Sequence, residues 1–200
     1  MTVYAAKPAF QKLLRPLAYR LADLGVSANA VTLSAMFLSV VLGAGLAINI
    51  VGGGRWVFFL LPAFLLIRMA LNAIDGLIAR ERHQVSRLGA YLNELGDVVS
   101  DSALYLPFAL LPYGWPAAML VALSAAGELA GVLGQTNGGT RRYDGPLGKS
   151  DRALWLSVLA LLLGFGVAPG VWLAVVLAVL CVLAALTIAN RVQRGLGEAN

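Results

Sequence analysis

The fold of this chain is decided by residues 72–101, which read NAIDGLIARERHQVSRLGAYLNELGDVVSD. Apolar sequence of helical character flanks this stretch on both sides. Polar side chains nevertheless gather in and just before it, at Arg68, Asn72, Asp75, Arg80, Asn93, Asp97 and Asp101. Residues three and four apart share one face of a helix, so Asn72 and Asp75 lie on one face and Asn93 and Asp97 on another. The polar run 81–88 joins the two segments, which predicts an antiparallel pair of helices whose polar faces meet.

Carboxylates set this deep in apolar sequence are costly and are usually functional. Hard divalent cations choose carboxylate and amide oxygens as ligands. The stretch therefore predicts a site where a divalent metal, Mg²⁺ or alternatively Mn²⁺, carries phosphate oxygens. The candidate ligands are Asn72, Asp75, Asn93, Asp97 and Asp101.

The composition indicates an integral membrane protein. Of the 200 residues, 60% are hydrophobic and 12% are charged, and the mean hydropathy is +0.80, which is far too apolar for a soluble domain. One cysteine, Cys181, excludes an internal disulfide framework, and one histidine, His83, excludes a His-based zinc cluster. The net charge of +5 does not indicate nucleic acid as a partner, because the basic residues lie in short loops where membrane topology explains them.

Six apolar runs are candidates to cross a bilayer, which takes roughly 20 helical residues. They cover approximately residues 30–51, 56–79, 88–111, 116–133, 153–167 and 171–189. The fifth run is short, and the second and third can span only if their polar faces turn inward. Before them, Lys and Arg alternate with leucines at helical spacing, which suits a helix lying on an anionic membrane surface, with Pro16 as a point of kinking or interruption. We expect an all-α polytopic membrane protein, one domain over residues 1–200, with six transmembrane helices and a surface-lying N-terminal amphipathic helix.

The positive charges are sorted to one set of span ends. That set holds Lys and Arg within residues 7–20, 80–87, 141–152 and 191–194, whereas the opposite set holds only Arg55. By the positive-inside rule, both termini and the loops after the second and fourth spans face the cytoplasm. Asp75 and Asp97 then open toward soluble nucleotides and metal ions. The expected location is the inner membrane of a bacterium.

The spacing of the polar residues resembles the signature of the CDP-alcohol phosphotransferases, also called CDP-alcohol phosphatidyltransferases. In that family an Asp, two residues, Asp-Gly, two residues, Ala-Arg, eight residues, Gly, three residues, Asp, three residues and Asp occur in order. Here the order is Asn72, Asp75-Gly76, Ala79-Arg80, Gly89, Asn93 and Asp97, with every spacing kept. Residues 25–33, GVSANAVTL, resemble the lead into the family's first span more weakly.

The resemblance implies the transfer of a phosphoalcohol group from a CDP-alcohol, such as CDP-diacylglycerol, to a hydroxyl acceptor, with release of CMP, in phospholipid biosynthesis. Asp97 would be the general base, and membrane lipid and a second copy of the chain, as a homodimer, would be partners. The acceptor stays open among glycerol phosphate, inositol phosphate, serine and a second lipid. The nucleotide pocket would be formed by Gly76, Ala79, Arg80 and Gly89.

The sequence departs from the family pattern at Asn72 and Asn93, where the family has Asp. An Asn oxygen can ligate a metal but carries no charge. Two divalent ions about 4 Å apart repel about four times as strongly as unit charges, whose repulsion is about 4 kcal/mol at an effective dielectric constant near 20. The two remaining carboxylates cannot offset this repulsion unless Asp101 joins them, so we expect at most one tightly bound metal in the resting protein.

A second group of candidate site residues is basic. Arg68 lies one turn before Asn72, and the loop 138–152 carries four further cations that suit a substrate phosphate or a lipid headgroup. These candidates are Arg68, Arg141, Arg142, Lys149 and Arg152. The plainer alternative for the loop cations is that they only set topology and bind anionic lipid. For the helices, it is that the pairs Asp75 with Arg80 and Asp97 with Arg68 only fix helix packing. Glu128, within the fourth span, is interpreted as an inward packing partner.

Rival functional classes remain open. A relative that binds lipid or nucleotide without catalysis is favoured by the two Asn positions. A prenyltransferase would show two Asp-rich motifs and more spans, and this chain has one such unit. A membrane transporter would more often show repeats or helices broken in mid-membrane.

Overall fold

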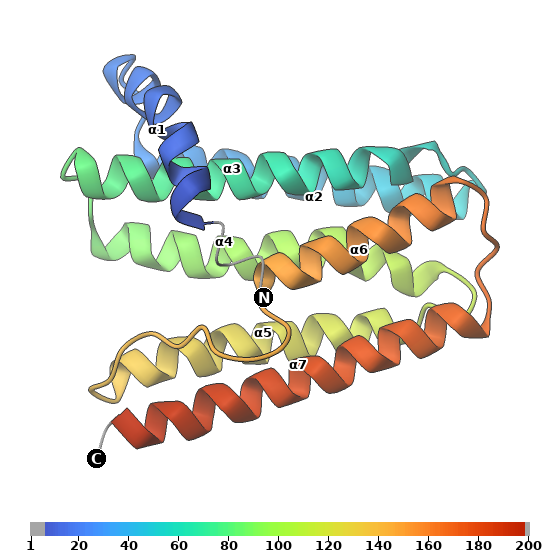
Figure 1. Cartoon of the computed structure of the whole chain (residues 1–200). Coiled ribbons are helices and arrows are strands. Elements are labelled where there is room, and N and C mark those ends of the chain that lie inside the picture. Colours follow the sequence, from blue (N-terminus) through green and yellow to red (C-terminus); the bar gives the residue numbers. More distant parts are fainter. Residues whose placement is uncertain (1–6, 199–200) are drawn as a thin grey trace.

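The regular structure of residues 7–198, the part of the chain described by the computed structural model, is entirely helical (Figure 1). This confirms the all-α prediction for these residues. Two 3₁₀ turns, η2 (Trp56–Phe59) and η3 (Leu106–Leu110), extend the helices that they adjoin. The helices are α1 (Lys7–Asp23), α2 (Ala28–Val51), α3 (Leu60–Glu81), α4 (Arg87–Tyr105), α5 (Pro116–Thr136), α6 (Lys149–Gly164) and α7 (Val171–Glu198).

Four of the helical segments are long and apolar enough to cross a membrane. They are Ala28–Val51, Trp56–Glu81, Pro116–Thr136 and Val171–Glu198, and they match the first, second, fourth and sixth predicted spans. The other two predicted spans correspond to α4, which carries four charged side chains, and to α6, which has only 16 residues. The helices and the composition together indicate a polytopic membrane protein.

The helices α2 to α7 run side by side along one axis, and α1 crosses them near the end where α3 stops (Figure 1). The close packing pairs are α5 with α7, α2 with both α3 and α4, and α3 with α6. The predicted antiparallel pair is present, but α2 packs on both of its members while α3 and α4 make few close backbone contacts with each other. Polar side chains from both helices fill the interval between them. The sequence pattern did not show that a third helix would pack on both members of this pair.

The packing of α2 against α4 depends on a glycine. A Cβ added at Gly43 would lie 2.1 Å from the main-chain oxygen of Ala103, so the two backbones touch where no side chain can intervene. This contact holds α4 at one height and one rotation relative to α2. It therefore also sets the direction in which Asp97 and Asp101 project.

The predicted N-terminal helix is present as α1, with Pro16 inside one continuous helix. Ala18 is fully buried in a small apolar cluster that includes Ile74 and Leu77 of α3. The Tyr19 hydroxyl donates to the Glu81 carboxylate, and this hydrogen bond raises the pKa of Tyr19. These contacts dock α1 against the last turns of α3, so α1 is attached to the bundle on one side.

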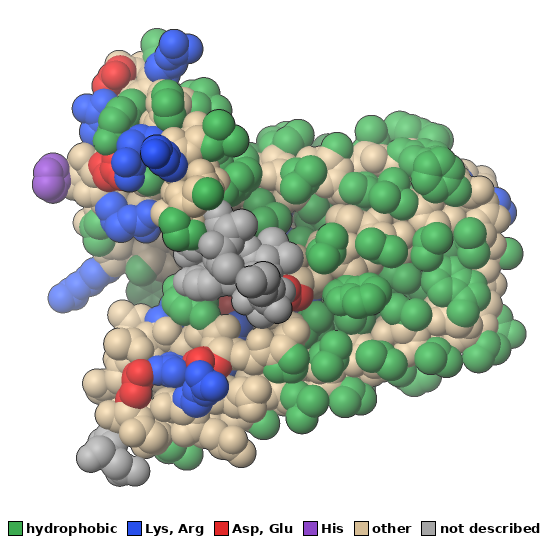
Figure 2. Space-filling model, in the orientation of Figure 1, with side chains coloured by type: hydrophobic (Ala, Val, Ile, Leu, Met, Phe, Trp, Pro, Cys, Tyr) green, Lys and Arg blue, Asp and Glu red, His purple; other side chains and the backbone are tan. Residues whose placement is uncertain are grey.

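Charged side chains gather at one end of the face shown in Figure 2, and the rest of that face is largely hydrophobic. We call the former the charged end; α2 and α4 begin there, and α3, α5 and α7 stop there (Figure 1). This separation is typical of a protein whose apolar girdle faces lipid.

Candidate functional site

The polar faces of α3 and α4 meet, as their spacing predicted. The Asn72 side-chain nitrogen donates to Oδ1 of Asp97 at 3.1 Å. One guanidinium nitrogen of Arg68 lies 3.4 Å from the same oxygen and 3.2 Å from the Asp97 main-chain oxygen. Because an ionised carboxylate only accepts hydrogen bonds, Asn72 turns its amide nitrogen, not its oxygen, toward Asp97.

The two oxygens of Asp97 have different surroundings. Lys149, the first residue of α6, forms an ion pair with Oδ1, which is the oxygen that Asn72 and Arg68 also contact. Within residues 7–198, no hydrogen bond or ion pair to Oδ2 is found. Asp97 is thus anchored through one of its two carboxylate oxygens.

Asp75 is held in a different way. The Thr32 hydroxyl of α2 donates to Oδ2 of Asp75 at 2.8 Å and also contacts the Ala28 carbonyl oxygen at 3.1 Å. No Lys or Arg in the described part of the chain forms an ion pair with Asp75, although the side chain is buried. Sequence reasoning missed Thr32; its signal was its position in GVSANAVTL, the weaker of the two resemblances.

Asp101 forms two buried ion pairs. Arg68 bonds its Oδ1 at 2.5 Å and Arg152 bonds its Oδ2 at 2.9 Å, so each oxygen is occupied by a guanidinium. Among residues 7–198, no three His, Cys, Asp or Glu side chains are placed to hold a metal ion together. Arginines from two other helices thus occupy both oxygens of Asp101, and its place in one ligand set with Asp75 and Asp97 stays a prediction.

Ion pairs continue from Asp101 across the bundle through Glu128 of α5. Arg152 bonds Oε1 of Glu128 at 3.0 Å, and Arg141 and Arg191 lie 3.4 and 3.6 Å from its other oxygen. Glu128 is buried and faces its neighbours, in line with its interpretation as an inward packing partner. The network was not visible in the sequence, because Glu128 and Arg191 carry no local motif.

The predicted nucleotide-pocket residues lie on α3 and α4, near the charged end. A Cβ added at Gly76 would stand 3.1 Å from a guanidinium nitrogen of Arg80, so a larger residue there would displace the exposed Arg80 side chain. Ala79 is half-buried at the edge of the cluster that docks α1. Gly89 faces the N-terminal turn of α2, where an added Cβ would be 3.0 Å from the side-chain oxygen of Asn29. Small residues therefore let neighbouring side chains approach closely at Gly76 and Gly89, and their role in a nucleotide pocket stays a prediction.

The remaining predicted metal position, Asn93, turns its amide nitrogen toward Glu94 at 3.5 Å. Glu94 in turn forms an ion pair with Arg141 of the loop between α5 and α6. Arg141 also stacks on the Tyr143 ring, with 5.0 Å between the guanidinium carbon and the ring centroid. Asn93 thus borders the site on the α4 side, next to a cation from the loop.

One predicted substrate residue lies away from the site. Arg142 pairs with Asp144 and with Glu198, near the end of α7. The Asp144 carboxylate also binds Arg194 at 2.7 Å, so these contacts tie the loop to α7. Ion pairs therefore join four of the predicted basic residues to acidic residues of the bundle, namely Arg68, Arg141, Lys149 and Arg152. Arg142 instead ties the loop to α7.

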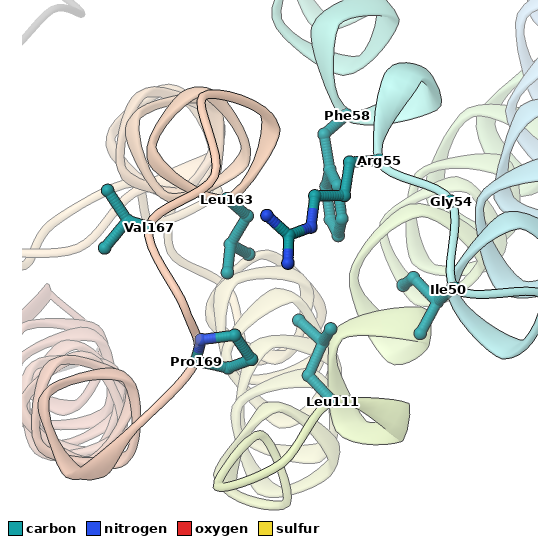
Figure 3. A pocket seen from close by; sticks show the side chains of 9 residues that line it. Ile50, Gly54, Arg55, Phe58, Leu111, Leu163, Val167 and Pro169 are labelled. Carbon is teal, nitrogen blue, oxygen red and sulfur yellow. The ribbon is translucent and has the colours of Figure 1, made fainter.

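A hollow lies at the opposite end of the bundle from the acidic residues (Figure 3). Its lining is apolar apart from Arg55, whose guanidinium extends between Phe58 and Leu163 and donates to the Gly166 carbonyl oxygen at 3.5 Å. No carboxylate lines this hollow. The acids and most of the buried cations lie elsewhere, so the site between α3, α4 and α6 is the better candidate for chemistry.

Known proteins resemble this chain in sequence and in fold. The sequence profile of the CDP-alcohol phosphatidyltransferases matches residues 25–182. The inner membrane protein YnbA of Escherichia coli is 50% identical over 156 residues, which are 77% of this chain and 76% of YnbA.

Two structures of the Mycobacterium tuberculosis phosphatidylinositol phosphate synthase PgsA1 share the fold at a TM-score of 0.73. The one with manganese and citrate is 20% identical and covers 91% of this chain and 88% of its own; the one with CDP-DAG bound is 21% identical and covers 92% and 94%. The match to the profile over most of the chain shows that it belongs to the CDP-alcohol phosphatidyltransferase family.

Proposed function

We propose that this protein transfers a phosphatidyl group from a CDP-alcohol, such as CDP-diacylglycerol, to a hydroxyl acceptor and releases CMP. Its family membership supports the class of reaction. The observation that carries the proposal is the geometry of Asp97, which is anchored through Oδ1 and has Oδ2 open. A related protein, PgsA1, has been seen with CDP-DAG bound, which supports a donor of this kind.

In the proposed reaction, the acceptor hydroxyl oxygen attacks the phosphorus that bears the diacylglycerol. Its bond to that phosphorus forms as the phosphoanhydride bond breaks, and the electron pair leaves on the phosphate oxygen of CMP. Oδ2 of Asp97 takes the proton of the hydroxyl, as a general base does in the chemical step. Asn72, Arg68 and Lys149 hold the carboxylate in place, because all three contact Oδ1.

The residues present fit one divalent ion shared with the donor, and they do not fit a resident pair. Asp75 is a buried carboxylate without an ion pair in the described part of the chain, and it would hold the ion together with diphosphate oxygens. The amide oxygens of Asn72 and Asn93 are available as neutral ligands, since the nitrogens face Asp97 and Glu94. A bound divalent ion would neutralise charge on the diphosphate as the anhydride breaks. The manganese in a PgsA1 structure supports a metal of this class.

We further propose how the chain sits in its membrane. The four apolar segments, together with α4 and α6 turned polar side inward, make six spans within a single domain, and α1 lies along the surface. The charge distribution puts the charged end and both termini in the cytoplasm. YnbA is named an inner membrane protein, which supports a bacterial inner membrane for this chain. Gly76, Ala79, Arg80 and Gly89 then form a nucleotide pocket open to the cytoplasm, and a homodimer is the expected assembly.

The test is formation of lipid product by purified protein. Labelled CDP-diacylglycerol is incubated with a panel of acceptors comprising glycerol phosphate, inositol phosphate, serine and phosphatidylglycerol, with Mg²⁺ or Mn²⁺ present. CMP and new phospholipid are measured by mass spectrometry, which also names the acceptor. Asp97→Asn should abolish turnover and largely spare nucleotide binding, because a base acts only in the chemical step. Turnover that persists in this variant would remove Asp97 from the proposed role.

A second candidate function is binding of lipid or nucleotide without turnover. It is favoured by one observation: Asp97 already forms ion pairs with both Lys149 and Arg68, as a carboxylate does when its role is to fix helix packing. The same assay separates the two candidates. CDP-diacylglycerol binding without CMP release from any acceptor would support this second function.

A further inference from the structure

Lys149 differs from the other cations around the acidic residues in its exposure. Its side chain is 29% exposed, whereas that of Arg68 is 4% exposed. The Arg68 guanidinium also already donates hydrogen bonds to Asp101 and to the main-chain oxygen of Asp97. An ammonium has three N–H donors, so the ion pair between Lys149 and one oxygen of Asp97 leaves two of them for a ligand. Lys149 is therefore a cation at Asp97 that can reach a bound molecule.

The start of α6 and the hydrogen bonds just before it fix the position of Lys149 inside the bundle. Helix α6 begins near the middle of the bundle rather than at the charged end (Figure 1), and Lys149 is its first residue. The main-chain nitrogen of Leu147 donates to the Thr187 hydroxyl of α7 at 3.0 Å, and that of Gly148 donates to the Asp151 carboxylate at 3.0 Å. These bonds fix the entry of α6, so the ammonium is positioned before any ligand arrives.

The charge of the site also calls for such a cation. A diphosphate needs its negative charge neutralised as its anhydride bond breaks. Asn72 and Asn93 bring no charge, and Asp101 is fully occupied by arginines. Of the predicted acidic ligands, only Asp75 forms no ion pair within residues 7–198, and one buried carboxylate supports one divalent ion better than two. The positive charge that a second divalent ion would bring has to come from elsewhere.

Resting on the proposed function, we propose that Lys149 is a built-in cation of the donor site. Its ammonium contacts the diphosphate beside Asp97 and supplies charge that would otherwise require a second divalent ion. The donor then binds with one divalent ion per site. Lys149 also links donor binding to the base, because the ammonium touches Asp97 and the diphosphate together.

The experiment measures binding of CDP and of Mn²⁺ to the full-length protein in nanodiscs. Calorimetry gives the affinity for CDP at several Mn²⁺ concentrations, and electron paramagnetic resonance of free Mn²⁺ counts the ions bound at saturating CDP. Lys149→Met removes the charge at similar length, and Lys149→Arg keeps it. Lys12→Met, an exposed site on α1, is the control for the substitution itself. A monodisperse elution profile and a thermal transition like that of the unaltered protein show that each variant is folded, and Lys149→Gln replaces any variant that is not.

The unaltered protein should bind one Mn²⁺ per site with CDP. Lys149→Met should weaken CDP binding by roughly 10- to 100-fold, as expected for loss of a charge-assisted contact, while Lys149→Arg and Lys12→Met stay within about threefold. Raising Mn²⁺ should restore part of the affinity of Lys149→Met as a second ion enters. Unchanged CDP affinity in Lys149→Met, or two Mn²⁺ in the unaltered protein, would overturn the role of Lys149 and leave the donor site standing. Failure of the unaltered protein to bind CDP would overturn both proposals.

Discussion

Removing the charge of Asp101 should destabilise the protein strongly, even without metal. Asp101→Asn keeps the size of the side chain but leaves Arg68 and Arg152 facing a neutral amide, and all three side chains are at most 7% exposed. Breaking a buried ion pair by removing one partner costs about 3–5 kcal/mol, because the remaining charge is left without compensation. For a chain of this size, about 2–4 °C in Tm corresponds to 1 kcal/mol, so the transition should fall by roughly 6–20 °C.

The assay is thermal unfolding followed by intrinsic tryptophan fluorescence, in detergent with EDTA. Asp23→Asn is the matched control, since Asp23 also pairs with an arginine, Arg82, but its side chain is 64% exposed. An exposed pair contributes about 0–1 kcal/mol, so the control should stay close to the unaltered protein. If Asp101→Asn unfolds within 2 °C of the control in EDTA but loses metal affinity, the ion-pair assignment is refuted and Asp101 is a ligand after all.

Three further predictions concern topology, metal and packing. In a cysteine-free background, a cysteine at Arg55 should react with an impermeant reagent outside the cell and one at Arg82 should not; the reverse pattern would invert the proposed orientation. Asn72→Asp combined with Asn93→Asp should raise Mn²⁺ affinity without nucleotide, measured by calorimetry, because two carboxylates are added beside Asp75; two tight sites in the unaltered protein would contradict this. Gly43→Val should abolish recovery of folded, monodisperse protein, since its Cβ would meet a main-chain oxygen of α4 at 2.1 Å, whereas Gly45→Val, where an added Cβ meets nothing within 4 Å, should be tolerated.

Much of the helical content could be predicted from the sequence because it depends on local properties. Hydropathy alone placed four spans, and spacing of three and four residues placed Asn72 and Asp97 on faces that do meet. The family signature was equally local, since its residues lie within a single pair of helices. Hydropathy does not mark the other two predicted spans as clearly, because α4 is polar on one side and α6 is short.

The sequence by itself determined which polar residues of α3 and α4 face one another, because helix periodicity sets the face on which each side chain projects. The tertiary structure alone decided what those residues contact. Asp101 became an ion-pair residue because Arg152, 51 positions away in the chain, is brought against it by α6. Lys149 reaches Asp97 because α6 starts halfway along the bundle, and α2 packs closely on α4 because Gly43 lets two backbones touch. Such contacts join faces of distant helices, and the choice between faces depends on packing over the whole bundle, which no local pattern records.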